Sequence, residues 1–522
     1  MSSVRVPVLL LMVCLSPYLI QAKSKWSNSQ SDYSKESQPN VIFILTDDQG
    51  YRDVGYHGSL FDTPIIDKLA AEGVKLENYY VQPICSPTRS QLMTGRYQIR
   101  YGLQHAVLNP YAPACLPTDE VTLAQKMKEA GYSTHMIGKW HLGFYEEACL
   151  PNNRGFDTYL GLLVGGGYHF IHSFPTTQHY DFHRDFSPAI EYNGTYSTHV
   201  FTDEAIDIIN NQDEDTPFFM YLSYQAPHSP LEVPERYKDP YRSIFNDEDR
   251  LIYAAMVSCL DEGIGNITAA LKAKGIYDNT VIIFSSDNGG PEGEGDAGNN
   301  WPLRGLKNSM FEGGIRVLGF VHSPLLSDNV KGSVSNELIH VSDWFPTIVE
   351  GIAGYNTNGT KPLDGVNQWK SIRGGTCSPR FEILHNIDPL TTVPGGGRDW
   401  VIEMSPFDVT INAAIRYRDW KLVTGDDGKT GWYAPPDTGI ESIDGPPTTE
   451  QVVWLYNVKK DPTEMNDLSD EHPEVVKFLL TKLQKYYLDS TPVYFPAQQR
   501  GQADPCLNGN NCIWGPWTPV QT

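Results

Sequence analysis

The chain has 522 residues, 40% of them hydrophobic and 20% charged, so it can bury a sizeable core and is long enough for two domains. Its acidic residues exceed its basic residues by 23, which argues against nucleic acid as a partner. The same charge would repel a polyanionic substrate unless the binding site itself were basic. The sequence pI of about 5.0 fits an acidic compartment such as the lysosome but does not establish one.

The first 22 residues have the pattern of a signal peptide. Arg5 precedes an apolar run over residues 6–20, and the pair Gln21 and Ala22 offers a cleavage site. This run is too short to span a bilayer, and no other stretch approaches about 18 consecutive apolar residues. Residues 23–40 are polar and are expected to be disordered. We therefore expect a chain without a membrane span that enters the secretory pathway, with the lysosome as its destination and the extracellular space as the alternative.

Strands and helices alternate from residue 41 to about residue 285. The apolar run 41–45 is typical of a buried parallel strand, and residues 63–73 follow as a helix that Gly73 ends. The other elements expected here are helices at 87–100, 122–130, 198–210 and 247–274, and strands at 132–138, 217–224 and 280–285. This alternation predicts an α/β fold, a large and mostly parallel sheet flanked by helices.

The pattern changes after about residue 375. Residues 412–423 indicate a hairpin, residues 452–456 a further strand and residues 473–488 an amphipathic helix. Loops rich in Gly and Pro, at 394–397 and 435–447, separate these pieces. We therefore expect a larger α/β domain over 41–375 and a smaller C-terminal α+β domain over 376–522 with an antiparallel sheet.

Six cysteines remain once Cys14 of the signal and Cys85, treated below, are set aside. An oxidising compartment favours disulfides among them, although six cysteines allow 15 pairings. We expect the pairs Cys115–Cys149 and Cys506–Cys512, and leave open whether Cys259 and Cys377 are free. Sequons that predict surface glycans begin at Asn193, Asn266 and Asn358.

Oxygen donors follow two of the predicted strands. Asp47 and Asp48 come after the first strand, and Asp287 and Asn288 come after the strand at 280–285. Ligands of open α/β sheets collect at the carboxyl ends of the strands, so these side chains should converge. Three carboxylates at one place need a cation, and hard oxygen donors favour Ca²⁺ or Mg²⁺ over zinc.

Basic and imidazole side chains follow other strand ends. The strand at 132–138 runs into Lys139 and His141, whose spacing of two would place both on one face of an extended segment. His228 follows the strand at 217–224, and Lys307 follows the Gly-rich stretch 289–298. Each of these features alone has an ordinary explanation as a turn, a solvated strand end, a loop histidine or a surface lysine. Their joint occurrence around Cys85 favours one common site.

Residues 85–96, with the sequence CSPTRSQLMTGR, carry the most specific pattern in the chain. The alternative explanation of Cys85 is a free or disulfide-bonded cysteine at the head of a helix, with Pro87 near its first turn. The whole run instead resembles the signature of the sulfatase family, in which the Cys is oxidised in the endoplasmic reticulum to formylglycine. The hydrated aldehyde is a geminal diol, in which one hydroxyl can attack sulfur while the other expels the product.

The resemblance extends from about residue 40 to the end of the chain. The motifs that carry it are residues 47–50, 85–96, 138–141, 225–228, 287–289 and 312–314. Residues 139–143, 301–304 and 455–462 resemble the arylsulfatase B branch, with the related arylsulfatases I and J. The chain departs from this branch in having fewer cysteines, with none in the region 161–180.

The resemblance implies an alkaline-phosphatase-like sulfatase fold, one Ca²⁺, maturation by the formylglycine-generating enzyme and a particular set of site residues. The metal ligands it implies are Asp47, Asp48, the modified Cys85, Asp287 and Asn288. The residues it places around the sulfate are Arg89, Lys139, His141, His228 and Lys307. The substrate it implies is sulfated N-acetylgalactosamine in dermatan or chondroitin sulfate.

The residue chemistry supports the same reaction. The negative charge of a sulfate monoester would be held by Ca²⁺ together with Arg89, Lys139 and Lys307. His228 is placed to protonate the departing alcohol, and His141 is the expected base that takes the proton of the second hydroxyl. We therefore expect a sulfuric ester hydrolase that acts on sulfated glycans and aryl sulfates.

Three alternatives stay open. A phosphomonoesterase or phosphodiesterase of the same fold would use Ser or Thr with two zinc ions, and the extra Asp and His ligands are missing near Cys85. A secreted sulfatase-like binding protein with little activity should have lost one of the charged residues, and none is lost here. A sulfatase of different glycan specificity would keep the same catalytic residues.

Overall fold

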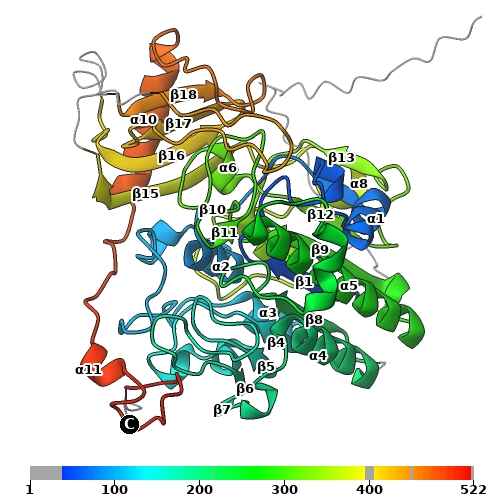
Figure 1. Ribbon diagram of the computed structural model, residues 1–522. Helices are drawn as coiled ribbons and strands as arrows, with labels where there is room; N and C mark the ends of the chain where they lie inside the picture. Colours follow the sequence, from blue (N-terminus) through cyan, green and yellow to red (C-terminus); the bar gives the residue numbers. More distant parts are fainter. Residues whose placement is uncertain (1–37, 214, 394–404, 447–450, 519–522) are drawn as a thin grey trace, which may run out of the picture. The chain divides into compact units, whose positions relative to one another are not determined.

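A ten-stranded sheet with helices on both faces forms the larger part of the structure (Figure 1). In spatial order its strands are β13 (Ser333–Ser335), β2 (Val74–Leu76), β12 (Gly319–His322), β9 (Thr280–Ser286), β1 (Asn40–Thr46), β8 (Phe218–Ser223), β4 (Ser133–Gly138), β5 (Thr158–Gly161), β6 (His183–Arg184) and β7 (Ser187–Pro188). The central strands β9, β1, β8, β4 and β5 are parallel, and β12, β6 and β7 run antiparallel to their neighbours. The predicted mostly parallel sheet is therefore confirmed.

The computed structural model describes residues 38–213, 215–393, 405–446 and 451–518. The predicted signal peptide, most of the segment 23–40 and the loop 394–397 lie outside these ranges. β1 begins at Asn40, and Gln38 already donates a hydrogen bond to the carbonyl of Ala353 at 2.8 Å. The segment expected to be disordered therefore gives way to ordered chain before residue 40.

Both faces of β1 are buried because its side chains alternate between two hydrophobic cores. Ile42 and Ile44 enter the core that lies under α1 (Pro64–Glu72), α4 (Ser197–Asn211) and α5 (Glu248–Lys274). Val41 and Phe43 enter the opposite core, under α2 (Cys85–Thr94), α3 (Leu123–Glu129) and α7 (Trp344–Pro346). A strand buried on both sides has an unbroken apolar sequence, which is what made this element predictable.

One predicted helix is shorter than expected. The sequence predicts a helix over 87–100, but α2 ends at Thr94, and a separate 3-10 helix spans Gln98–Arg100. Gly95 adopts the left-handed conformation with φ 68°, and its N–H closes onto the carbonyl of Gln91. A glycine in this conformation terminates an α-helix, so the apolar residues beyond it do not continue α2.

A smaller antiparallel sheet follows, in the order β15 (Glu382–Thr392), β16 (Ile411–Tyr417), β17 (Trp420–Thr424) and β18 (Val453–Asn457). The amphipathic helix α10 (Pro473–Leu488) packs its apolar face on this sheet, where Leu479 and Leu483 join Ile415 and Leu422 in one core. The predicted hairpin, strand, helix and antiparallel sheet are confirmed. The boundary near residue 375 stays a prediction, because Gln38–Thr522 form one compact unit.

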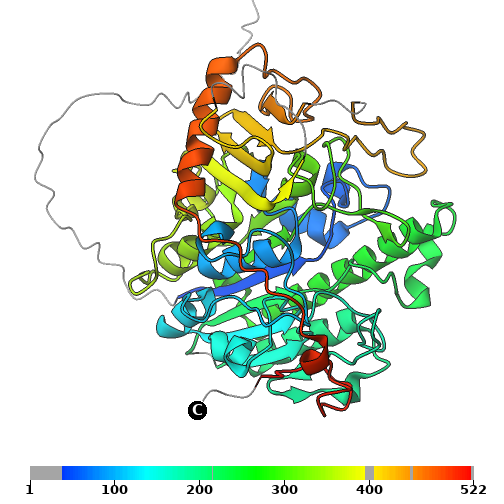
Figure 2. The same ribbon diagram turned by 90° about the vertical axis from the view of Figure 1, so that its left-hand side faces the viewer.

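The C-terminal segment leaves the small sheet and returns to the large one (Figure 2). The amide of Gln499 donates to the carbonyl of Tyr111, ahead of the short helix α11 (Arg500–Ala503). The amide of Tyr180 donates to the carbonyl of Cys512, and the carbonyl of Tyr180 accepts a hydrogen bond from the amide of Trp514. Residues beyond α10 thus lie against the first part of the chain, although the predicted domain 376–522 included them.

The remaining β-strands and α-helices of the described chain are short. They are β3 (Tyr79–Tyr80) paired with β14 (Ile339–His340), β10 (Glu292–Gly293) paired with β11 (Asp296–Ala297), and the helices α6 (Glu312–Ile315) and α8 (Trp369–Gly374). Among the described residues, no helix has both the length and the apolar character to cross a membrane. The three sequon asparagines are exposed, as surface glycans would require, and glycosylation itself stays a prediction.

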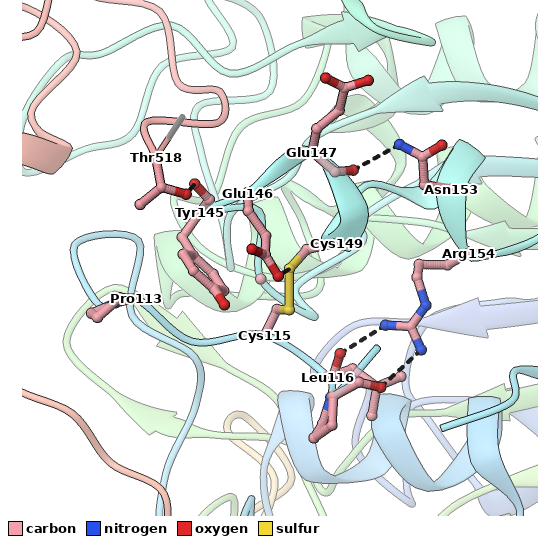
Figure 3. Close-up of a disulfide and its surroundings, with 12 residues drawn as sticks. Pro113, Cys115, Leu116, Tyr145, Glu146, Glu147, Cys149, Asn153, Arg154 and Thr518 are labelled. Carbon is pink, nitrogen blue, oxygen red and sulfur yellow. Dashed lines mark hydrogen bonds between the residues drawn. A yellow bond between two sulfur atoms is a disulfide. The ribbon is translucent and has the colours of Figure 1, made fainter. Parts of the chain in front are cut away.

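Both predicted disulfides are present. Cys115–Cys149 joins the loop ahead of α3 to a 3-10 helix at Glu147–Cys149, where Arg154 also donates to the carbonyl of Leu116 (Figure 3). Cys506–Cys512 closes a short loop in the C-terminal segment. The sequence left open whether Cys259 and Cys377 are free. Cys259 is a buried free thiol, whereas Cys377 is not free.

Candidate active site

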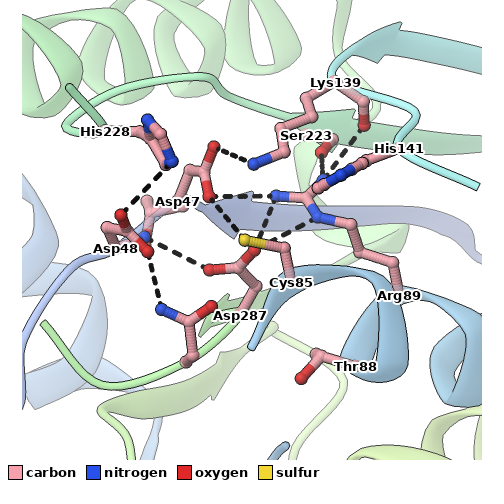
Figure 4. Close-up of polar contacts among 12 residues, drawn as sticks. Asp47, Asp48, Cys85, Thr88, Arg89, Lys139, His141, Ser223, His228 and Asp287 are labelled. Carbon is pink, nitrogen blue, oxygen red and sulfur yellow. Dashed lines mark hydrogen bonds and ion pairs between the residues drawn. The ribbon is translucent and has the colours of Figure 1, made fainter. Parts of the chain in front are cut away.

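Four oxygen-donor residues meet at the carboxyl ends of β1 and β9, two neighbouring parallel strands (Figure 4). The amide of Asp48 lies 3.2 Å from Oδ1 of Asp287, and Nδ2 of Asn288 donates to Oδ1 of Asp48 at 2.6 Å. Asp47, Asp48, Asp287 and Asn288 are all at most 1% exposed. The structure therefore brings together the residues that the sequence placed at one edge of the sheet.

Cys85 and Arg89 come from α2, whose N-terminus points at these carboxylates. Cys85 is the first residue of the helix, and its Sγ lies 3.8 Å from Oδ1 of Asp47. Arg89 lies one turn further on the same face of the helix. Its Nε and Nη2 donate to Oδ2 of Asp287 at 3.1 and 2.8 Å, and its Nη1 donates to the carbonyl of Lys139 at 3.0 Å.

Two lysines each contact one of the aspartates that follow β1. Nζ of Lys139, which follows β4, lies 2.6 Å from Oδ2 of Asp47. Nζ of Lys307 lies 2.7 Å from Oδ2 of Asp48, and Nε2 of His228 lies 3.4 Å from the same oxygen. Together with Arg89, the two lysines therefore balance the three carboxylates of the site, so the excess negative charge of the chain, −23 in total, lies outside it.

His141 reaches the site by a different route from the one expected. The argument from spacing assumed an extended backbone, but His141 adopts φ 53° and lies beyond the end of β4. Its ring lies against Gly165, where an added Cβ would come within 2.5 Å of the imidazole. His141 still lies beside Arg89 and Lys139 (Figure 4), and its buried Nδ1 has no hydrogen-bond partner in the described structure.

Ser223 is a site residue that the sequence analysis missed. It is the last residue of β8, and its Oγ accepts a hydrogen bond from Nη1 of Arg89 at 2.5 Å. The available signal was a small polar residue at the end of an apolar strand that is followed by His228. Ser223 and Asp287 together fix the guanidinium of Arg89 before any ligand binds.

Burial and neighbouring charges shift the pKa values of the acidic groups. Burial and the charge of Asp47 raise the pKa of Asp287, whereas Lys307, with His228 and Lys139, lowers the pKa of Asp48 despite its burial. Burial and the charge of Asp287 raise the pKa of the Cys85 thiol to about 12. An unmodified Cys85 would therefore be a protonated, weak nucleophile at neutral pH.

The basic groups are shifted in opposite directions. Burial lowers the pKa of His228 to about 4, although Asp48 opposes the shift, and burial also lowers the pKa of His141. The pKa of Lys307 is raised because the charge of Asp48 outweighs its burial. At neutral pH the free site therefore holds neutral imidazoles and a charged Lys307.

The donor set fits a hard divalent cation. Oδ1 of Asn288 is buried and has no hydrogen-bond partner in the described structure, so an acceptor is left unsatisfied among three carboxylates. Asp47, Asp48, Cys85 and His228 each offer one atom, and these atoms lie within 4.8 Å of one another. These four atoms are two carboxylate oxygens, the sulfur of Cys85 and a nitrogen of His228, so the preference for Ca²⁺ over zinc depends on the further oxygens of Asp287 and Asn288.

The arrangement of these residues agrees with the comparison of the chain with protein families. A family model described as Sulfatase matches residues 39–355, which is more than half of the chain. The chain belongs to the sulfatase family. Relatives of this sulfatase support hydrolysis of sulfate esters as its activity. Arylsulfatase J of Mus musculus is 49% identical over 92% of this chain and 80% of its own length. N-acetylgalactosamine-6-sulfatase of Homo sapiens is 30% identical over 67% of this chain and 69% of its own length.

Solved structures share the fold of this sulfatase. The structure of Ps i-CgsB in complex with k-i-k-neocarrahexaose has a TM-score of 0.73 and 29% identity, and the match covers 90% of this chain and 97% of that one. A phosphonate monoester hydrolase of Agrobacterium radiobacter is similar with a TM-score of 0.53 and 20% identity over 86% of this chain and 96% of that one. At this identity the second likeness shows the fold alone, which therefore cannot by itself choose between sulfate and phosphonate chemistry.

Proposed function

We propose that this sulfatase uses a formylglycine made from Cys85 and one Ca²⁺ to remove sulfate from sulfated glycans and from aryl sulfates. The observation that carries the proposal is the position of Cys85. Its side chain, at the start of α2, lies next to Asp47 and is surrounded by Arg89, Lys139 and Asp287 (Figure 4). A buried thiol with a raised pKa is poorly suited to the reaction, so this position makes chemical sense for a modified residue.

Asp47, Asp48, Asp287 and Asn288 would hold the Ca²⁺ together with the modified residue 85. When bound, the ion would polarise the sulfate and lower the pKa of a hydroxyl on the hydrated formylglycine. The unsatisfied Oδ1 of Asn288 supports this ligand set.

Three cationic side chains would hold the sulfate. Arg89 is the most rigid of them, because Asp287, Ser223 and the carbonyl of Lys139 fix its guanidinium. Lys139 and Lys307 are each paired with one aspartate, so their charges are in place before substrate arrives. Preorganised charge of this kind stabilises the developing negative charge of the transition state.

The two histidines would transfer protons. We assign His228 as the general acid that protonates the departing alcohol and His141 as the base that acts when sulfate is released. A general acid must be protonated, and the pKa of His228 is only about 4 in the free site. An acidic compartment would favour the protonated form, and the negative charge of a bound sulfate would raise the pKa of His228. Lys307 shares Oδ2 of Asp48 with His228 and is the alternative acid.

The proposed substrate is the 4-sulfate of N-acetylgalactosamine units in dermatan or chondroitin sulfate. Residues 139–143 and 301–304 support it through their resemblance to the arylsulfatase B branch. A relative named for N-acetylgalactosamine 6-sulfate supports the sugar but not the position of the sulfate. The oligosaccharide complex of a structural neighbour supports a saccharide substrate in general.

The proposal includes a route through the secretory pathway to the lysosome, with the formylglycine-generating enzyme acting on Cys85 in the endoplasmic reticulum during maturation. The sequence of residues 1–22 and the match of cysteine pairs to disulfides support this route. All five proposed metal ligands, Cys85 included, and all five residues proposed around the sulfate are present. The presence of all these residues therefore favours an active enzyme over a binding protein without activity.

Hydrolysis of defined saccharides tests the proposal. The purified protein would be assayed between pH 4 and pH 8 on N-acetylgalactosamine 4-sulfate, its 6-sulfate, glucosamine 6-sulfate and an aryl sulfate, with Cys85→Ala as the inactive control. We expect hydrolysis of the 4-sulfate and the aryl sulfate, fastest in acid. Preference for another sugar would replace the substrate assignment, and no hydrolysis of any sulfate ester would favour the binding protein.

A further inference from the structure

The loop that carries Lys307 lies between the two sheets. On one side, the amide of Lys307 donates to the carbonyl of Gly290 at 3.3 Å, and the amide of Asn308 donates to the carbonyl of Pro83 at 2.7 Å. Pro83 lies two residues before Cys85, so this side of the loop is tied directly to the proposed nucleophile. The other side of the loop meets the four-stranded sheet.

Arg304 makes the first contact with the small sheet. Its Nε donates to the carbonyl of Thr430 at 2.8 Å, and its Nη2 donates to the carbonyl of Gly428 at 2.5 Å. Its Nη1 donates to the hydroxyl of Tyr456, in β18, at 2.7 Å. The guanidinium lies over the ring of Phe311 at 3.9 Å, and the side chain is 1% exposed.

The second contact with the small sheet comes after Lys307 in the sequence, where Glu312 meets Lys421 of β17. Nζ of Lys421 lies 3.0 Å from Oε1 of Glu312 and 2.8 Å from Oε1 of Glu464. The amide of Glu312 also donates to Oε2 of Glu464 at 2.7 Å. All three side chains are at most 1% exposed. The chain is therefore held three residues before Lys307 and five residues after it.

The charge of Arg304 needs an explanation, because its three hydrogen bonds all go to neutral oxygen atoms. Burying a cation is costly unless it is well paired, and the aromatic ring offsets part of this cost. The guanidinium can fix an orientation, because its N–H donors form a rigid planar fork. The fork fixes the start of the loop in one orientation relative to β18.

We propose that Arg304 is a positioning residue, which places the ammonium of Lys307 against Asp48 and the sulfate by anchoring the loop to the small sheet. The inference rests on the proposed function for the role of Lys307. It gives the four-stranded sheet a part in the reaction, although the residues proposed for catalysis all precede it in the chain.

A double-mutant cycle with Lys307→Ala tests the proposal. Arg304→Gln should lower kcat/KM by about 10²-fold, the cost of a misplacement of about 1 Å. The same substitution in the Lys307→Ala background should cause almost no further loss, because Arg304 acts through Lys307. Arg304→Lys should restore part of the activity. Equal losses in both backgrounds would mean that Arg304 only stabilises the fold, and would overturn the proposal.

A milder variant guards against unfolding. Tyr456→Phe removes one hydrogen bond from Arg304 and leaves the loop itself unchanged. We expect a smaller loss of kcat/KM that also disappears in the Lys307→Ala background. Tyr132→Phe is the matched control, because Tyr132 is also a buried tyrosine with one hydrogen bond, to Pro39 ahead of β1, and should leave kcat/KM unchanged.

A crystal structure of Arg304→Gln separates this inference from the proposed function, because it needs no turnover. The proposal expects Nζ of Lys307 to leave its position 2.7 Å from Oδ2 of Asp48. An unchanged contact would overturn the inference even if the enzyme hydrolyses every sulfate ester tested. Conversely, a displaced Lys307 in a protein without sulfatase activity would support the positioning role and reject the function.

Discussion

Nζ of Lys307 lies 2.7 Å from Oδ2 of Asp48, although 259 positions separate the two residues in the chain. Nε2 of His228 approaches the same oxygen at 3.4 Å. One carboxylate oxygen therefore contacts two side chains that come from distant segments of the chain. Its position just beyond β1, in the middle of the sheet, makes this possible.

We predict that Cys85 is formylglycine in protein made through a eukaryotic secretory pathway. The modification converts a buried thiol of raised pKa into a hydrated aldehyde that can attack sulfur. Peptide mass spectrometry would detect it, and Cys85→Ala should abolish turnover while the unfolding temperature stays close to that of the wild type. A fully active enzyme whose residue 85 still alkylates as a thiol would contradict the prediction.

We predict that Asp287→Ala loses metal and activity together. Asp287 is a proposed Ca²⁺ ligand and also the main partner of Arg89, so its loss disturbs both halves of the site. Metal analysis and an aryl sulfate assay on the same preparation would show the two losses. Asp157→Asn is a suitable control, because Asp157 contacts Thr134 near the other end of β4 and should change neither quantity. Stoichiometric zinc, or active enzyme free of metal, would argue against Ca²⁺.

Much of the fold could be predicted because its central strands are buried on both faces. Val41 and Ile42 face different cores, so the run 41–45 had to be apolar throughout. The positions of Asp47 and Asp287 followed from the same reasoning, since the ends of neighbouring parallel strands meet at one edge. Local rules were enough wherever burial or a helix cap determined the outcome.

The remaining features depend on contacts between distant residues. His141 has a positive φ, but no glycine or other local sequence signal predicts it. The ring of His141 packs against Gly165, and this contact is found only in the folded structure. Ser223 looks like an ordinary strand end, and Arg304 is only part of the motif at 301–304 with no role of its own, until Arg89 and Tyr456 are placed beside them. The return of residues beyond α10 to Tyr180 likewise follows from tertiary packing, which the sequence pattern does not record.

We predict that Asp261 makes the protein less stable as the pH rises. Burial raises the pKa of Asp261 to about 6, even though its carboxylate accepts hydrogen bonds from the amides of Ile65 and Ile66 at the start of α1. Because the folded-state pKa exceeds the unfolded value, the favourable contribution is complete below about pH 4 and is lost as the pH rises through about 6. The total change is about 3 kcal/mol at most.

Asp261→Asn isolates this effect, because every other titrating group is shared by the two proteins. Denaturant unfolding at pH 4.5 and pH 7.5 would give the free energy of unfolding of each. We expect the wild type to lose stability relative to Asp261→Asn between these two values. A difference between the two proteins that does not change with pH would show that the folded-state pKa of Asp261 is not raised.

The last prediction concerns His228 as the general acid. His228 lies at the edge of the site, its Nε2 is 3.4 Å from Oδ2 of Asp48, and its Nδ1 lies 2.5 Å from the carbonyl of Ser229, which orients the ring. A positioned acid contributes on the order of 10²–10⁴-fold to the rate. That help matters most for a poor leaving group such as a sugar alcohol. It matters little for nitrocatechol, which departs readily as its anion.

His228→Ala should therefore lose on the order of 10²-fold or more in kcat/KM on a sulfated sugar, and much less on nitrocatechol sulfate. Lys139→Ala is the matched comparison, because Lys139 serves sulfate binding, which both substrates share, and it should reduce both rates alike. Measuring kcat/KM for both variants on both substrates completes the test. Equal losses for His228→Ala on the two leaving groups would assign His228 to sulfate binding. The acid would then be Lys307, the other side chain that contacts Oδ2 of Asp48.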